Sequence, residues 1–201
     1  DTGIAFARRR YPDSRGFLAY FQSYSNTYDE LDRLKAIYAI ALEHPDITGL
    51  VIGTRPDCLP EETLDYLAEL AKTRLVELEI GIESCDDGVL EACNRGHDFA
   101  CTADAIRRAA GRGLFITGHL LLGLPGETQA SLLAGARALA QLPIDALKFH
   151  QLQIFKGTHM AKEYEQNSEQ FRFFGLQEYI DFFVEFLEHL NPSFVVERFA
   201  G

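Results

Sequence analysis

In the stretch LVELEIGIES, residues 75–84, apolar and polar side chains alternate almost without exception. Successive side chains of a β-strand point to opposite faces, so this pattern predicts a strand with one apolar and one polar face. The apolar face consists of Val76, Leu78, Ile80 and Ile82. The polar face consists of Glu77, Glu79, Gly81 and Glu83. We expect the first face to pack under helices and the second to line a polar space.

Segments of strand length alternate with segments of helical period along the whole chain. Strands are expected at Phe17–Gln22, Gly49–Gly53, Leu75–Ile82, Leu114–Leu122 and Ile144–Leu152. Helices are expected at about 4–11, 29–43, 61–72, 86–94, 102–112, 129–141 and 176–190. The polar stretch Lys162–Gln170 interrupts this rhythm, and the apolar run Ser193–Phe199 is a doubtful sixth strand. A repeat of strand, helix and strand predicts parallel strands with right-handed crossovers, and hence the α/β class.

Two α/β architectures fit this order of elements, an open doubly wound sheet and a barrel. The nucleotide-binding patterns GxGxxG and GxxxxGK[ST] are absent in the required context, and a doubly wound sheet would need strands that are apolar on both faces. Polar side chains instead recur on one face of three successive strands. They are Glu79, Thr117, His119, Lys148 and His150. We therefore predict one α/β domain over residues 1–201, an incomplete barrel of five strands and one doubtful strand that lacks an earlier strand on its N-terminal side.

Composition limits the classes of function. Hydrophobic residues make up 47% and charged residues 24% of the chain, which is typical of folded globular proteins. The 19 basic and 30 acidic residues give a formal net charge of −11, which disfavours nucleic acid as a partner. No apolar run has the length of a membrane span, and a cytoplasmic location is expected. Cys58, Cys85, Cys93 and Cys101 match no metal-binding or redox spacing, so we expect free thiols and no metal site.

The segments at the carboxyl ends of the expected strands are rich in polar residues and glycine. Ligands bind at these ends in parallel α/β folds. Five motifs lie at or near them: YFQSYSNTY at 20–28, IGTRPDC at 52–58, EIGIES at 79–84, NRGHD at 94–98 and HLLLGLPGET at 119–128. Simple turns would require glycine and proline, but they would not also require Asn26, Arg55 and Glu83.

Taken together and in this order, the five motifs resemble the radical S-adenosylmethionine (SAM) superfamily. The resemblance is to its YhcC-type proteins, which are related to the elongator catalytic subunit and to oxygen-independent coproporphyrinogen oxidase, and it extends over nearly the whole chain. It implies a partial (β/α)6 TIM-like barrel, truncated here at its N-terminal side, that holds SAM and a [4Fe-4S] cluster. It also implies reductive cleavage of SAM to a 5′-deoxyadenosyl radical, which abstracts hydrogen from a substrate.

The resemblance also assigns cofactor-binding residues. The segment that contains Gln22, Ser25 and Asn26 takes the place of the one that contacts the methionine part of SAM. Glu83, followed by Ser84, corresponds to the residue that meets the ribose. Arg95 corresponds to the arginine that pairs with the SAM carboxylate. His119 stands near the ribose where relatives carry aspartate, and Gly157 stands where the chain approaches the adenine.

The substrate-facing side chains are expected to come from the polar strand faces and from one strand end. They are Tyr20, Arg55, Glu79, Lys148 and His150. Lys148 leaves three interpretations open. It is a structural partner of Glu79, or a Schiff-base lysine with a lowered pKa in a metal-free lyase or aldolase, or part of a ligand-binding barrel without catalysis. No catalytic residue is assigned.

One departure from the superfamily pattern is large. The CxxxCxxC loop, which supplies three thiolates to the cluster, does not occur in this sequence. In YhcC-type proteins that loop precedes the segment that begins here at Asp1, so the resemblance places the cluster ligands outside this chain. We therefore expect this chain to be a fragment that is inactive in radical formation. The substrate is not indicated; nucleic acid is disfavoured for the fragment, but it is possible for the parent because relatives modify tRNA.

Overall fold

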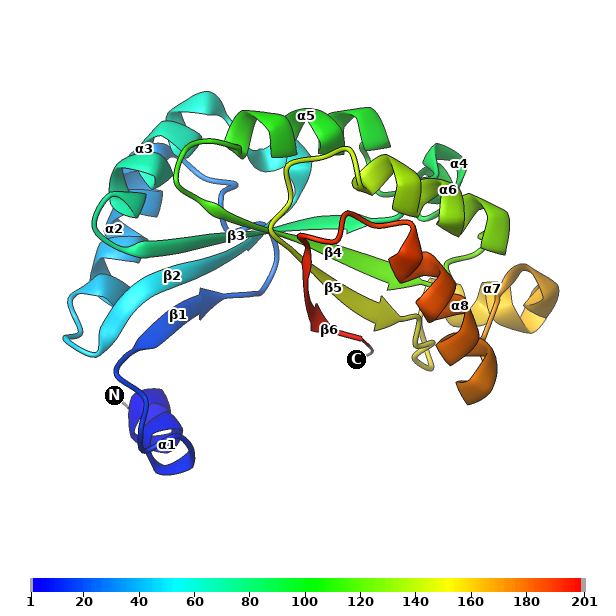
Figure 1. The fold of residues 1–201 in the computed structure, drawn as a ribbon, viewed down its shortest axis with the longest axis horizontal. Coiled ribbons are helices and arrows are strands. Elements are labelled where there is room, and N and C mark those ends of the chain that lie inside the picture. Colours follow the sequence, from blue (N-terminus) through cyan, green and yellow to red (C-terminus); the bar gives the residue numbers. More distant parts are fainter. Residues whose placement is uncertain (1, 200–201) are drawn as a thin grey trace.

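The computed structural model describes residues 2–199, and its centre is a single sheet of six parallel strands. The strands follow one another across the sheet in chain order, and each pairs with the next. They are β1 (Phe17–Phe21), β2 (Ile47–Thr54), β3 (Leu75–Glu83), β4 (Phe115–Leu122), β5 (Ala146–Gln151) and β6 (Val195–Arg198). The sheet curves into a half-barrel with helices on its outer side (Figure 1). The predicted α/β class and partial barrel are confirmed, and the doubtful sixth strand is present.

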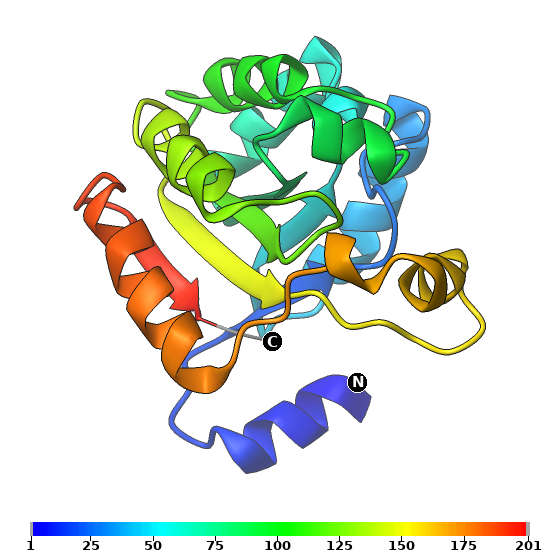
Figure 2. The same cartoon turned by 90° about the vertical axis from the view of Figure 1, so that its right-hand side faces the viewer.

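Most of the helices lie on one side of the sheet (Figures 1 and 2). The helices are α1 (Thr2–Arg10), α2 (Leu31–Leu42), α3 (Glu61–Ala71), α4 (Asp87–Ala92), α5 (Phe99–Ala109), α6 (Gln129–Leu139), α7 (His159–Gln166) and α8 (Leu176–Glu188). Two short 3₁₀ turns occupy Pro56–Cys58 and Ser168–Gln170. Figures 1 and 2 show α2, α3, α5, α6 and α8 along the outer side, whereas α1 stands below β1 on the open side. No helix within residues 2–199 is long and apolar enough to cross a membrane.

The apolar face of β3 lies in the core between the sheet and the outer helices. Val76, Leu78, Ile80 and Ile82 are all buried. They belong to one cluster with helix residues such as Leu64, Leu67 and Ile106. Burial of apolar surface on this side fixes which face of the strand the helices cover. The other face of the same strand is thereby turned to the open side of the half-barrel.

Two local differences from the predicted elements have physical causes. Within the stretch Lys162–Gln170, residues up to Gln166 belong to α7, whose first turn is capped by the Thr158 hydroxyl accepting from the Ala161 amide. None of its residues is fully buried, and its apolar side consists of little more than Met160 and Tyr164, which is too short a pattern to predict a helix from the sequence. Helix α5 begins at Phe99 because Asp98 caps it, and Thr102 lies inside the helix instead of at its start.

The carboxyl end of β3 is irregular. Glu83 has a φ of 63°, a left-handed conformation that is uncommon outside glycine, and the pairing of β3 with β4 shifts register between Gly81 and Glu83. After this bend, the Ser84 side chain is buried and its hydroxyl donates to Glu127 Oε1 at 2.8 Å. Glu83 remains on the open side. Glu83 and Ser84 therefore lie on opposite sides of the sheet, where alternation along a strand also places two neighbouring residues.

Candidate functional site

A cavity of about 950 Å³ opens on the uncovered face of the sheet, around the carboxyl ends of the strands. Five of the predicted cofactor-binding residues line it: Gln22, Ser25, Glu83, Arg95 and His119. The five predicted substrate-facing residues also line it: Tyr20, Arg55, Glu79, Lys148 and His150. Strands β1 to β5 and the segments that follow them therefore bring ten distant positions together, as the parallel arrangement requires.

The floor of the cavity is a network centred on Glu79, whose side chain is only 1% exposed. The Tyr20 hydroxyl donates to Glu79 Oε2 at 2.5 Å, and Lys148 Nζ forms an ion pair with Glu79 Oε1. Burial by itself raises the pKa of Glu79, but the contacts with His119, Lys148 and Tyr20 outweigh it and lower the pKa to about 2. Glu79 is therefore a carboxylate at neutral pH, held by donors on three other strands.

Lys148 is surrounded by carboxylates. Besides Glu79, its Nζ lies 2.8 Å from Glu197 Oε2 and 3.7 Å from Glu77 Oε1. Burial lowers the pKa of Lys148, but the ion pairs with Glu197 and Glu79 raise it above the ordinary value for lysine. A Schiff-base lysine must lose its proton easily. The lowered pKa expected for Lys148 is therefore wrong, whereas the interpretation of Glu79 and Lys148 as an ion pair agrees with the structure.

The upper part of the cavity contains buried donors without partners. Arg95 NH2 donates to the Gly81 carbonyl at 3.1 Å and lies 3.2 Å from Glu83 Oε1. Arg95 Nε is buried and has no hydrogen-bond partner among the described residues. His119 Nε2 is also buried and lies 3.1 Å from Glu79 Oε2, but not in hydrogen-bonding geometry. Buried polar atoms are rarely left unpaired, so Arg95 Nε indicates a position for a ligand.

Gly81 allows Arg95 to lie against the strand. A Cβ atom at residue 81 would stand 2.6 Å from Arg95 NH2 and 2.8 Å from Glu83 Oε1, closer than side chains approach. Glycine at this position therefore leaves room for the guanidinium and the carboxylate at the end of β3.

Three predicted cofactor-binding residues lie outside the cavity lining. The Asn26 side-chain amide donates to the carbonyls of Phe21 and Gly53, both at 2.9 Å, and so ties the loop after β1 to β2. Ser84 is turned to Glu127 on the covered side, as described above. Gly157, with a φ of 84°, precedes the cap of α7. The expected cofactor contacts of these three residues receive no support from the geometry, because their groups serve local structure.

Several lining residues were not predicted. They are Tyr24, Tyr28, Asp57, Cys58 and Arg198. Tyr24 is 98% exposed, and Asp57 is held by Arg55, whose Nε and NH2 donate to its two carboxylate oxygens at 2.8 and 2.6 Å. The first four belong to motifs quoted from the sequence and could have been assigned with them. Arg198 belongs to the short strand β6 and has no local sequence signal.

The four cysteines do not form a cluster site. All four are free thiols, as predicted. Among residues 2–199, one group of three potential metal ligands lies close together, and it consists of Glu77, Glu79 and Glu197 around the Lys148 ammonium. An iron–sulfur cluster requires thiolates gathered at one place. The described residues therefore do not fit a [4Fe-4S] cluster.

Comparison with known sequences gives the family. The family model described as Radical SAM superfamily matches residues 15–139, and the model described as Radical_SAM C-terminal domain matches residues 144–201. Protein YhcC of Escherichia coli (strain K12) is 37% identical over 189 residues, which are 94% of this chain and 60% of that protein. YtqA of Bacillus subtilis (strain 168) is 32% identical over 92% of this chain and 57% of that protein. The chain thus spans about 60% of the length of these relatives.

Solved structures share the fold. The archaeal Methanocaldococcus infernus Elp3 with an N-terminal deletion has a TM-score of 0.78 at 16% identity, over 96% of this chain and 50% of that chain. Coproporphyrinogen III oxidase (HemN) from Escherichia coli has a TM-score of 0.64 at 18% identity, over 82% of this chain and 37% of that chain. These likenesses agree in architecture with the six-stranded half-barrel. The family model and the relatives of more than 30% identity establish that this chain belongs to the radical SAM superfamily.

Proposed function

We propose that the cavity binds SAM, and that this chain is the SAM-binding part of a radical SAM enzyme. The observation that carries the proposal is the buried, unpartnered Arg95 Nε beside Glu83 at the carboxyl ends of the strands, with His119, which contacts Glu79, lining the same cavity. Ligand pockets typically measure ~300–1,000 Å³, so a cavity of about 950 Å³ offers room for a nucleoside cofactor together with a substrate.

Each of these side chains has a chemical task in the proposal. The Glu83 carboxylate accepts hydrogen bonds from the two ribose hydroxyls. Arg95, anchored through NH2 on Gly81, uses its free Nε on the SAM carboxylate, which a guanidinium binds strongly. His119 donates through Nε2 to a ribose oxygen. Gln22 and Ser25 border the part of the cavity assigned to the methionine moiety.

The family's reaction requires a [4Fe-4S] cluster, which together with SAM supplies reductive cleavage of the cofactor. Because the described cysteines do not fit that cluster, we assign its ligands to sequence outside these 201 residues. The work of this chain is then to bind and orient SAM and to hold the substrate. On its own it should not form the radical.

SAM binding can be tested by calorimetric titration of the protein with SAM and with S-adenosylhomocysteine. The variant Arg95→Gln should weaken binding by about tenfold to a hundredfold, because a charge-assisted hydrogen bond is lost. The matched control is Arg137→Gln, which removes the same charge from an exposed position on α6. Equal affinities for the two variants, or no binding by the unmodified protein, would contradict the proposal.

Radical formation needs a separate measurement. The longer protein that contains the cysteine loop should yield 5′-deoxyadenosine when it is reconstituted with iron and sulfide without oxygen and then reduced in the presence of SAM. The 201-residue chain treated identically should yield none. SAM binding without 5′-deoxyadenosine in the longer protein would instead favour a ligand-binding barrel without catalysis.

A further inference from the structure

Four lysine and arginine side chains line the cavity, and three of them are paired with carboxylates. Arg55 is held by Asp57, and Arg95 lies beside Glu83. Lys148 is held by Glu77, Glu79 and Glu197. Arg198, the fourth, forms no ion pair with a carboxylate among residues 2–199. No carboxylate of the described residues therefore occupies the donors of this guanidinium.

The contact that Arg198 does make is with a histidine. Arg198 NH1 lies 3.4 Å from His150 Nε2, and since a guanidinium can only donate, Nε2 must accept. His150 is then neutral and carries its proton on Nδ1, which is a further donor. Burial lowers the pKa of His150, and the charges of Arg198, His119 and Lys148 lower it further. A neutral histidine occupies one donor of the guanidinium and adds no negative charge beside it.

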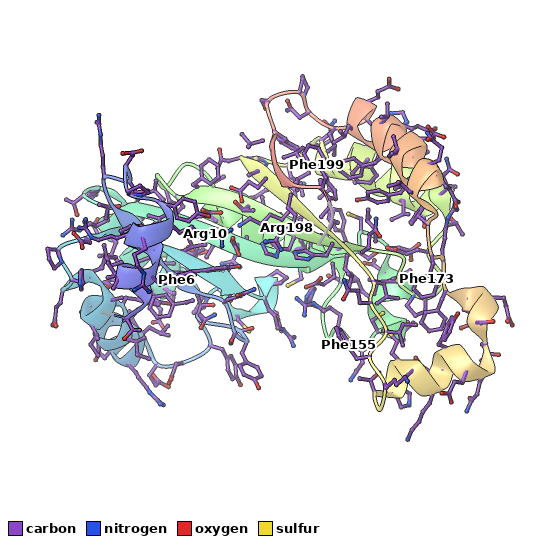
Figure 3. The ribbon with its side chains drawn as sticks, turned by 90° about the horizontal axis from the view of Figure 1, so that it is seen from below. Phe6, Arg10, Phe155, Phe173, Arg198 and Phe199 are labelled. Atoms are coloured by element: carbon purple, nitrogen blue, oxygen red, sulfur yellow. The ribbon has the colours of Figure 1, made fainter. Side chains whose placement is uncertain are left out.

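Arg198 and His150 lie on the last two strands, apart from the proposed SAM residues at the end of β3. Arg198 on β6 is in register with Lys148 on β5, and Figure 3 shows it over the open face of the sheet. His150 also borders an adjoining hollow of about 350 Å³ that it shares with Glu83 and His119. The pair therefore stands where a second molecule could lie next to a cofactor bound at Glu83.

We infer that Arg198 and His150 form a subsite for an anionic group of the substrate, a carboxylate or a phosphate. The inference rests on the proposed function, because it takes the β3 side of the cavity to be occupied by SAM. A guanidinium presents parallel N–H donors that match two oxygens of either anion, and the His150 ring supplies one donor more. The carboxylates of the floor, Glu77, Glu79 and Glu197, form ion pairs with Lys148 and none with Arg198, whose donors remain available to a ligand.

The test is a titration of the isotope-labelled protein with inorganic phosphate and with acetate, followed through the ring signals of His150 by NMR. We expect saturable shifts, and at least about tenfold weaker binding in Arg198→Gln, because charge-assisted hydrogen bonds are lost. Arg137→Gln, which changes the net charge equally outside the cavity, should behave as the unmodified protein. The anion that binds more tightly identifies phosphate or carboxylate as the group recognised.

A parallel titration with SAM separates this inference from the proposed function. The SAM affinity of Arg198→Gln should stay within about twofold of that of the unmodified protein, because Arg198 is placed on the substrate side. A larger loss would mean that Arg198 binds the cofactor, and it would overturn the assignment. No saturation by either anion, or equal saturation in Arg198→Gln, would overturn it as well. If no variant bound SAM while anion binding still depended on Arg198, the proposed function would fail and the subsite would stand.

Discussion

The side chains on the two faces of β3 are buried through different interactions. On the helix side, Leu78 and Ile80 are buried by apolar neighbours, and no polar group there needs a partner. On the cavity side, Glu79 is almost as fully buried, but only because Tyr20 and Lys148 supply donors to its carboxylate. A strand face without covering helices can therefore bury a charged side chain when neighbouring strands supply the opposite charge.

The cavity face itself divides into a satisfied floor and an unsatisfied upper part. The floor carboxylate Glu79 has partners on several strands, whereas Arg95 Nε and His119 Nε2 have none among the described residues. Stability should therefore depend on the helix face and the floor. Ligand binding should depend on the upper part.

The largest effect is expected from removing the cation of the floor. Lys148→Met leaves Glu77, Glu79 and Glu197 facing one another without their ammonium, and should lower the free energy of unfolding by about 4 kcal/mol. Urea denaturation measures this change. Lys72→Met is the control, since the Lys72–Glu69 pair is exposed and should contribute little. A similar small effect of both substitutions would mean that the floor network does not stabilise the fold.

A somewhat smaller loss is expected on the helix face. Leu78→Ala removes a fully buried side chain from the core and should cost about 3 kcal/mol in the same denaturation experiment. SAM affinity, measured on the folded variant, should not change, because Leu78 faces away from the cavity. If Leu78→Ala folded fully but no longer bound SAM, the two faces of β3 would not be independent.

The pH dependence of stability should reveal Glu79. Its pKa in the folded protein, about 2, is below the value of 4.5 for a free side chain, so its contribution is complete above pH 4.5 and is lost as the pH falls towards 2. This loss should amount to on the order of 2 kcal/mol. Between pH 5 and 3, the free energy of unfolding of Glu79→Gln should fall less steeply than that of the unmodified protein. Parallel curves would exclude Glu79 as the titrating group.

The smallest effect on stability, with a clear effect on binding, is expected at Glu83. Glu83→Gln should weaken SAM binding by about tenfold, or about 1.4 kcal/mol, because hydrogen bonds to a charged acceptor are replaced by weaker ones. Glu62→Gln, at an exposed position on α3, is the control. Calorimetry and urea denaturation on the same samples would show whether binding falls without a loss of stability. Unchanged SAM binding in Glu83→Gln would show that Glu83 does not contact the ribose.

The architecture and most of the cavity lining could be predicted from two regularities. Apolar and polar residues alternate along each strand, and parallel strands have their carboxyl ends at the same edge of the sheet. Once Val76 and Ile80 are assigned to the covered face, Glu79 must lie on the open one, and parallel strands bring their carboxyl ends together. Residues as distant as Tyr20 and Lys148 could therefore be assigned to one space without any contact information.

What was missed depends on non-local or irregular features. The exception is Ser84: it directly follows Glu83, so the alternation of the strand already places it on the covered side, where its hydroxyl donates to Glu127. The pKa of Lys148 depends on Glu197, which β6 brings beside β5 from 49 positions further along the chain. The pairing of β6 with β5 also brings Arg198 to the cavity. A short strand with little burial carries too weak a pattern for these contacts to be inferred.

A crystal structure of the protein grown with SAM would test most directly whether the cavity binds this cofactor. We predict density for the cofactor in the cavity, with its ribose against Glu83, its carboxylate on Arg95 and one of its oxygens within hydrogen-bond distance of His119 Nε2. Density for SAM elsewhere on the molecule, or an empty cavity at saturating SAM, would contradict the account.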